Sequence, residues 1–150
     1  MDPRPFAYIV SVILLVFGIC GFVPPLTPAE TDPLRVAAGV GGPQLFGVFP
    51  SSPVLAGIHA AMGLWGLIAG AKLGRSVIFA RVAGFVFLGL TAMGTIPLTD
   101  ELFGAAPLYG NNLLLHGPLA LLSFLFGWLY QHSKPQPASP PAPPPTHTAF

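Results

Sequence analysis

Four apolar stretches, each close to the length of a membrane span, constrain what this chain of 150 residues can fold into. They cover residues 6–23, 53–71, 77–96 and 113–130. A helix of roughly 20 residues crosses the hydrocarbon core of a bilayer, which is about 30 Å thick. Lipid offers no hydrogen bonds to the backbone, so such stretches are expected to be helical. The sequence therefore predicts an all-α membrane protein with four transmembrane helices.

The composition agrees with a membrane protein and excludes several other classes. Only 7% of the residues are charged and 53% are hydrophobic, with a mean hydropathy of +0.72. A soluble domain of this size would lack the polar surface it needs. A net charge of +1 provides no basic field for nucleic acid, so the expected environment is the lipid bilayer. The single Cys20 has no partner for a disulfide within one copy.

The distribution of basic residues predicts an orientation. Five of them fall near one surface of the predicted bundle: Arg4, Lys72, Arg75, Arg81 and Lys134. The opposite loops contain Arg35 and four acidic residues. Because cytoplasmic loops are enriched in Lys and Arg, both termini are expected in the cytoplasm. Arg81 lies inside the third span, and its long side chain is expected to reach back to water at that surface.

The end of the chain differs in composition from the rest. Residues 1–134 form the predicted four-helix domain, whereas residues 135–150 are rich in proline. Proline fixes φ and removes backbone donors, and few apolar residues remain to form a core. We expect a disordered cytoplasmic tail. Two roles stay open for it, a solubilising end and a docking segment for a partner domain.

A repeated segment indicates that the chain contains an internal duplication. LFGVFPSSPVLAGIH at residues 45–59 aligns without a gap on LFGAAPLYGNNLLLH at residues 102–116. Both begin with Leu-Phe-Gly, share a proline and end in histidine. The order is then helix, outer loop, helix, twice over, and consecutive two-span units necessarily have the same orientation in the membrane. The predicted fold is a duplicated two-helix unit.

Helix-start signals place both histidines near the outer surface. Pro53 suits a first helical position, with Ser51 or Ser52 as the N-cap. Asn111 or Asn112 is the candidate N-cap of the fourth helix. Each histidine then lies about one to two turns inside its helix.

The residues below each histidine on the same helical face are all small. They are Gly63, Gly66 and Gly70 below His59, and Ala120, Ser123 and Gly127 below His116. Small residues let helix backbones approach closely in lipid. These six are the predicted helix-packing residues, and Gly66 and Gly70 fit either internal packing or contact with a second copy. Both imidazoles are expected to face inward, because a polar ring facing lipid is costly.

Three interpretations of the histidine pair stay open. In the first, each imidazole bonds a loop carbonyl or a neighbouring helix and serves structure alone. In the second, His59 and His116 bind a cofactor, as axial ligands of a haem or as a quinone contact. In the third they form a proton or metal site, although two ligands are fewer than the three that catalytic zinc uses.

The segments 43–50 and 99–107 in the outer loops are predicted as short interfacial helices. Acidic residues at the start of the second segment suit a first helical turn, and the helix would bury Leu102 and Phe103. A lid over a cavity between the histidines is the alternative. No sequence motif of a hydrolase, a nucleotide-binding loop or a zinc protease is present, so an enzyme is not the favoured class.

The paired segments LFGVFPSSPVLAGIHAAMGLWGLIAG and PLYGNNLLLHGPLALLSFLFGWL resemble a bacterial four-helix membrane family, domain of unknown function 4383. In that family, the second span looks like V-N-x-x-H-N-x-x-H and the fourth like D-N-x-x-H. The resemblance covers about residues 6–130. It implies a multi-pass protein of the bacterial inner membrane, with no assigned activity.

His59 and His116 match the last histidine of each half in the family pattern. Leu55 and Ala56 stand where the family has His-Asn, and Asn112 lies four residues before His116 instead of three. These departures remove polar partners from the second span. We therefore expect a structural or interaction subunit, with another membrane protein or a second copy as its partner.

Overall fold

The computed structural model describes residues 2–37 and 41–132. Its four long helices are α1 (Pro3–Cys20), α3 (Pro53–Gly70), α4 (Leu73–Gly94) and α5 (Asn111–His132). All four are long and apolar enough to cross a membrane, which confirms the predicted all-α fold with four candidate spans. The predicted tail at 135–150 lies outside the described residues.

The helix boundaries differ from the predicted ones, and at the start of α1 a side-chain cap explains the difference. α1 begins at Pro3 instead of residue 6, since Asp2 caps it by accepting a bond of 2.9 Å from the Arg4 amide. It ends at Cys20, before the 3₁₀ turn Pro24–Leu26. α4 begins four residues earlier than predicted, directly after a tight turn, and α5 begins two residues earlier.

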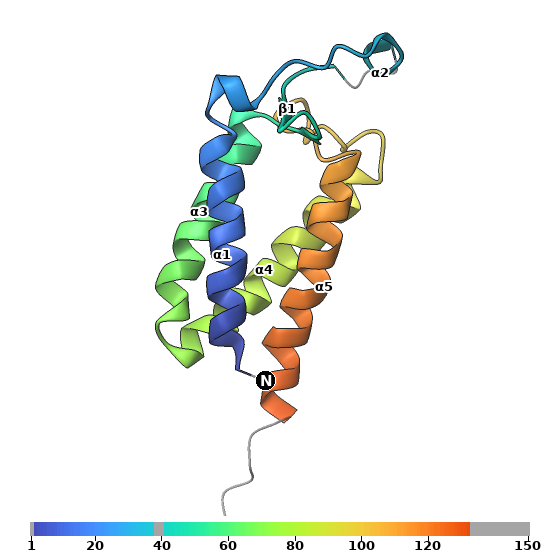
Figure 1. Cartoon of the computed structure of the whole chain (residues 1–150). Helices are drawn as coiled ribbons and strands as arrows, with labels where there is room; N and C mark the ends of the chain where they lie inside the picture. The colour runs from blue at the N-terminus through green and yellow to red at the C-terminus, as the bar shows by residue number, and fades with distance from the viewer. Residues whose placement is uncertain (1, 38–40, 133–150) are drawn as a thin grey trace, which may run out of the picture.

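The four helices form two hairpins. α1 packs chiefly against α3, and α4 packs chiefly against α5, with fewer contacts between the pairs (Figure 1). We call the end with the two long connections, residues 21–52 and 95–110, the loop end. The opposite end is the turn end, where α1 starts, α3 turns into α4 and α5 finishes.

Glycines on α3 let α1 approach closely. A Cβ on Gly63 would lie 2.8 Å from the backbone oxygen of Ser11, and one on Gly66 would clash with the Ser11 hydroxyl. A Cβ on Gly70 would lie 2.9 Å from the ring of Tyr8. These three glycines thus pack inside the chain, against α1.

The second hairpin combines small residues with one charged contact. Ala120 and Ser123 on α5 are buried, and the Ser123 hydroxyl has no hydrogen-bond partner among the described residues. Arg81 Nε donates to the Gly127 carbonyl at 2.9 Å, with its guanidinium 5.2 Å from the Trp128 ring centroid. Arg81 therefore joins α4 to α5, which differs from the expectation that it reaches back to water.

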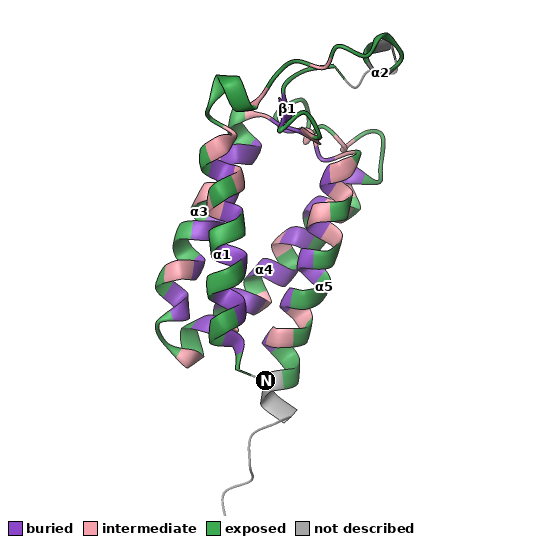
Figure 2. Cartoon of the chain, viewed as in Figure 1, coloured by how far each residue is buried: buried purple, intermediate pink, exposed green. Residues whose placement is uncertain are grey.

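Aromatic side chains fill the space between the hairpins. Phe6 and Phe126 stack with centroids 4.6 Å apart, and Phe79 and Phe87 are fully buried. Buried and exposed positions alternate along every long helix (Figure 2). Each helix thus has one face in the bundle and one toward lipid.

The prediction of an interfacial helix at 43–50 is wrong. The segment forms two short antiparallel strands, β1 (Gln44–Leu45) and β2 (Phe49–Pro50), with Leu45 paired to Phe49. Phe46 and Gly47 between them have φ of 56° and 70°. A left-handed backbone cannot continue a helix, so the chain turns back here. A further short helix, α2 (Pro33–Ala37), lies in the same connection.

The prediction of a helix at 99–107 is also wrong. Residues 97–105 form successive turns, with φ of 47° at Leu102, 56° at Phe103 and 85° at Gly104. Three left-handed residues in a row interrupt any helix. Phe103 is 80% exposed instead of buried.

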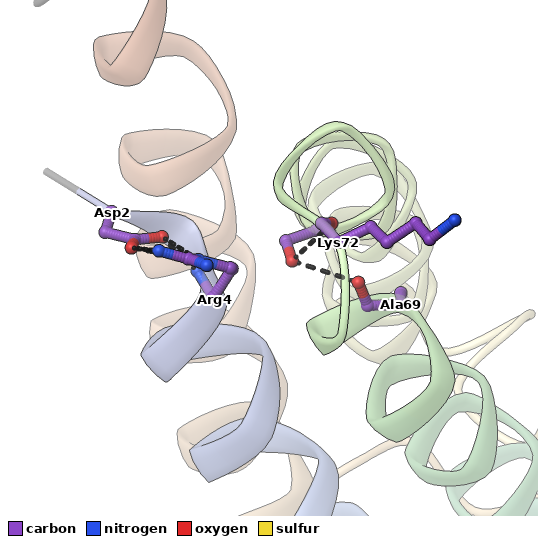
Figure 3. Close-up of polar contacts among 5 residues, drawn as sticks. Asp2, Arg4, Ala69 and Lys72 are labelled. Carbon is purple, nitrogen blue, oxygen red and sulfur yellow. Dashed lines mark hydrogen bonds and ion pairs between the residues drawn. The ribbon is translucent and has the colours of Figure 1, made fainter.

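Local polar bonds hold the turn end. Asp2 and Arg4 form an ion pair of 2.7 Å at the start of α1 (Figure 3). The Ser76 hydroxyl donates to the carbonyls of Ala69 and Lys72 at 3.1 Å, which braces the turn between α3 and α4. The Lys72 ammonium projects away from the Asp2–Arg4 pair (Figure 3).

Candidate functional site: a buried histidine pair

The starts of α3 and α5 position the two histidines. Ser52 caps α3 as predicted, because its hydroxyl accepts a bond of 3.2 Å from the Leu55 amide while Pro53 occupies the first helical position. The prediction of an asparagine cap on the fourth span is wrong. α5 begins at Asn111, so Asn111 and Asn112 lie within its first turn and their side chains are available for other bonds.

The two imidazoles face each other between the hairpins. His59 Nε2 on α3 lies 3.1 Å from His116 Nε2 on α5. The rings are inclined by 59° with centroids 5.4 Å apart. His59 is 3% exposed and His116 is 0% exposed. An N–H···N hydrogen bond at this distance links one hairpin to the other, within the spans.

Phenylalanine rings surround the pair. Phe17 on α1 meets His59 edge-on, with centroids 6.0 Å apart and an angle of 89°. Phe87 on α4 stacks on His116 at 5.6 Å and 29°, and lies 6.5 Å from His59. All four long helices thus contribute one ring to the site, and its surroundings are apolar. A hydrogen bond is stronger in such surroundings, and an unpaired nitrogen there is more costly.

The geometry favours one direction for the shared proton. One Nε2 must donate and the other must accept. His116 Nδ1 is buried and has no hydrogen-bond partner among the described residues. If His116 accepted at Nε2, this Nδ1 would be a buried N–H without an acceptor, and orphaned buried donors are rare. The favoured arrangement has His116 Nε2–H donating to His59 Nε2.

Two asparagine amides bind the loops above the pair. Asn112 Nδ2 donates to the carbonyl of Pro50 at 2.8 Å and to that of Pro107 at 2.7 Å. Asn111 Nδ2 donates to the carbonyl of Val48 at 3.0 Å. The start of α5 in the second hairpin is therefore tied to the loop of the first.

A reciprocal bond ties the start of α3 to the loop of the second hairpin. The Ser52 hydroxyl donates to the Ala105 carbonyl at 3.1 Å. A cavity of about 180 Å³ lies between the two loops, lined in part by Glu101 and Tyr109 and by neither histidine. Burial, together with the negative charges of Glu101 and Asp100, raises the pKa of the Tyr109 phenol.

The family model described as "Domain of unknown function (DUF4383)" matches residues 4–129, a range that includes both histidines and covers nearly all of the four helices. The chain belongs to the DUF4383 family. No curated protein and no solved structure shows significant similarity to it.

Several residues around the histidine pair are not apparent from the sequence. Phe17 and Phe87 lie in apolar runs without a distinguishing pattern, so their contacts with the imidazoles depend on helix rotation. The sequence suggests Asn112 as a helix cap, whereas in the structure its amide donates to two loop carbonyls. The imidazoles bond each other, and the asparagines bond the loops. Of the two bonds expected for each histidine, the structure has the one to another helix, whereas the loop carbonyls are bonded by the asparagines.

Proposed function

We propose that this protein is a structural or interaction subunit of the bacterial inner membrane, and not an enzyme. The observation that supports the proposal is the bond of 3.1 Å between His59 and His116. It uses the facing nitrogen of each ring to join the two hairpins. The surrounding aromatic rings separate the bond from lipid, as suits an element that holds helices together. The partner is another membrane protein or a second copy.

The proposal includes an internal duplication of a helical hairpin. Support comes from the backbone at matching positions of the two repeats. Phe46 and Gly47 have φ of 56° and 70°, and the equivalent Phe103 and Gly104 have φ of 56° and 85°. A left-handed phenylalanine is uncommon, so its occurrence at both equivalent positions favours a common origin.

The proposed topology places both termini in the cytoplasm. Support comes from Arg4, Lys72 and Arg75 at the turn end and from Asp100 and Glu101 at the loop end. A reporter fused after residue 150 tests it. Green fluorescent protein should fluoresce there and alkaline phosphatase should be inactive. Active phosphatase at this position would show the opposite orientation.

The function itself is tested by purification of the full chain in a mild detergent. The proposal predicts a colourless protein that purifies with a fixed stoichiometry, either with one partner or with itself. The His59→Ala variant should lower the yield of this assembly. A Soret absorption band in the native protein that disappears in His59→Ala and His116→Ala would contradict the proposal and show haem binding.

The spacing of the nitrogens favours a metal ion over haem as the second candidate. Two nitrogen ligands on one tetrahedral zinc ion lie about 3.3 Å apart, close to the 3.1 Å between the Nε2 atoms. Axial ligands on opposite sides of a haem iron lie roughly 4 Å apart, and a macrocycle must fit between the rings. No group of three candidate metal ligands occurs among residues 2–37 and 41–132.

A titration with Co²⁺ tests this second candidate. Binding to both imidazoles predicts visible d–d absorption bands that are lost in His59→Ala and in His116→Ala alike. An Asn111→Ala variant is the control, because Asn111 lies in the same helix start but contacts the loop. Bands that persist without the histidines would exclude the pair as the metal site.

A further inference from the structure

A groove lies between α3 and α4 at the turn end. The two helices diverge from their short connection (Figure 1). The groove has a volume of about 330 Å³. It is lined by Trp65, Ile68, Ala69, Arg75 and Ile78. It lies far from the histidine pair along α3, since it belongs to the last two turns of that helix.

The wall of the groove is apolar and open to the lipid side of the bundle. Ile68 and Ile78 are 56% and 57% exposed, one on each helix. Trp65 is held by an edge-on contact with Phe79, with centroids 5.4 Å apart. Because both helices are candidate spans, the medium at this surface is acyl chain. The groove thus has the shape and chemistry to hold a hydrocarbon chain.

The mouth of the groove carries positive charge. Arg75 lines it and is exposed, in the first turn of α4. Lys72, directly before α4, provides no side-chain cap, so the amides of that turn add positive partial charge beside the guanidinium. In the part of the chain that the structure describes, no acidic side chain lines the groove. An arginine fork matches a phosphate group, which accepts two of its N–H groups at once.

We infer that this groove binds an anionic phospholipid, with the phosphate at Arg75 and an acyl chain against Trp65, Ile68 and Ile78. The charge selects the headgroup, since a choline ammonium near Arg75 would be repelled. The apolar wall provides the rest of the contact, which inorganic phosphate cannot use. Basic pockets between helices at a membrane surface commonly recognise such lipids.

Fluorescence of Trp65 provides a local measurement of this site. The chain contains two tryptophans, so Trp128→Phe leaves Trp65 as the sole emitter. This protein is placed in phosphatidylcholine vesicles with a small, equal fraction of brominated phosphatidylglycerol or brominated phosphatidylcholine, whose bromines quench on contact. We expect the phosphatidylglycerol to quench with an apparent affinity about fivefold higher. Equal quenching by the two lipids would contradict the inference.

Two charge variants separate a specific site from a general surface potential. Arg75→Gln should reduce the fivefold preference to about one. Lys72→Gln removes the same charge three residues away but does not line the groove, so it should keep most of the preference. An equal loss in both variants would show surface attraction alone. If Arg75→Gln fails to fold, the comparison of the two lipids in the protein with Arg75 intact still tests whether the groove prefers an anionic lipid.

A competition experiment identifies the source of the phosphate. Millimolar inorganic phosphate should leave the quenching by phosphatidylglycerol unchanged, because it lacks the acyl chain. Displacement by phosphate would show a simple anion site and overturn the lipid assignment. A third outcome would also overturn the lipid assignment. If neither brominated lipid quenches Trp65 in concentrated protein, but both do so after the protein is diluted, a second copy occupies the groove.

Discussion

The two hairpins contact each other through different kinds of side chain at the two ends of the bundle. At the loop end, polar side chains cross between the hairpins, with His59 bonded to His116 and Asn112 bonded to the opposite loop. At the turn end the hairpins meet through apolar side chains, with Phe6 stacked on Phe126.

Close packing of α1 on α3 is common to both ends of the bundle. A Cβ on Gly18 near the loops would clash with Ala60, just as one on Gly70 near the turn would clash with Tyr8. Helices in lipid lack a hydrophobic drive toward each other, so close packing and polar bonds are the two available means. Within the first hairpin this protein uses close packing along its whole length, whereas polar bonds join the two hairpins at the loop end.

The difference follows from the separation of the helices. α3 and α5 stand apart near the loops (Figure 1), and the imidazole pair reaches across from His59 to His116. Backbones that are apart cannot gain from small residues, whereas long polar side chains can span the distance. A polar bond has direction, so the loop end also fixes how the hairpins are rotated. We therefore expect substitutions in the close packing and substitutions in the polar bonds to lower the free energy of unfolding by different amounts.

The largest effect is expected from crowding the close contact within the first hairpin. Gly63→Ala places a methyl group 2.8 Å from backbone atoms of Ser11 and Leu15, which cannot move aside as a side chain would. We expect a loss of about 2–3 kcal/mol in the free energy of unfolding, measured by denaturant titration in detergent. Gly57→Ala is the matched control on the same helix, with nothing within 4 Å of its Cβ, and should be neutral or slightly stabilising. Equal losses of unfolding free energy in Gly63→Ala and Gly57→Ala would contradict the role of Gly63 in close packing.

The polar ties of the loop end should give an intermediate effect. Asn112→Ala leaves the carbonyls of Pro50 and Pro107 without their donor, and we expect a cost of about 1–2 kcal/mol. Hydrogen exchange in residues 101–109 should also become faster. Asn111→Ala is the control, because Asn111 makes a single, more exposed bond, and it should cost less than about 1 kcal/mol. If Asn111→Ala lowered the free energy of unfolding more than Asn112→Ala, Asn111 would be the more important tie between the loops.

The smallest effect is expected at a buried hydroxyl without a partner. Ser123→Ala removes a polar atom that makes no hydrogen bond with the described residues, so stability should stay within about 0.5 kcal/mol or rise slightly. Ser76→Ala, whose hydroxyl bonds to Ala69 and Lys72, should cost about 1 kcal/mol. Thermal unfolding of the two variants in the same detergent distinguishes these outcomes. A clear loss of stability in Ser123→Ala would show that its hydroxyl makes a bond that the structure does not contain.

The helical architecture was predictable because its determinants are local. Hydropathy identifies all four spans, and Ser52 with Pro53 correctly marks the start of α3. The histidines could be assigned to a helix and a depth. Their mutual distance could not, since it depends on how two hairpins pack in three dimensions.

The loops were predicted less well because helix signals there compete with unusual backbone conformations. Asp100 and Glu101 suit a first helical turn, but the left-handed backbone at Leu102 and Phe103 prevents one. No composition rule predicts positive φ at a leucine or a phenylalanine. The loop contacts of Asn112 were missed for a related reason, since they depend on where the other loop lies.

The imidazole bond is tested most directly by a double-mutant cycle that combines His59→Leu with His116→Leu. Each single variant leaves one buried imidazole without its partner, so each should cost about 2 kcal/mol of unfolding free energy. The double variant removes both polar rings and should cost clearly less than the sum, with a coupling of about 1–2 kcal/mol. If the losses of unfolding free energy in the two single variants simply add in the double variant, the histidines act independently and do not hold the hairpins together.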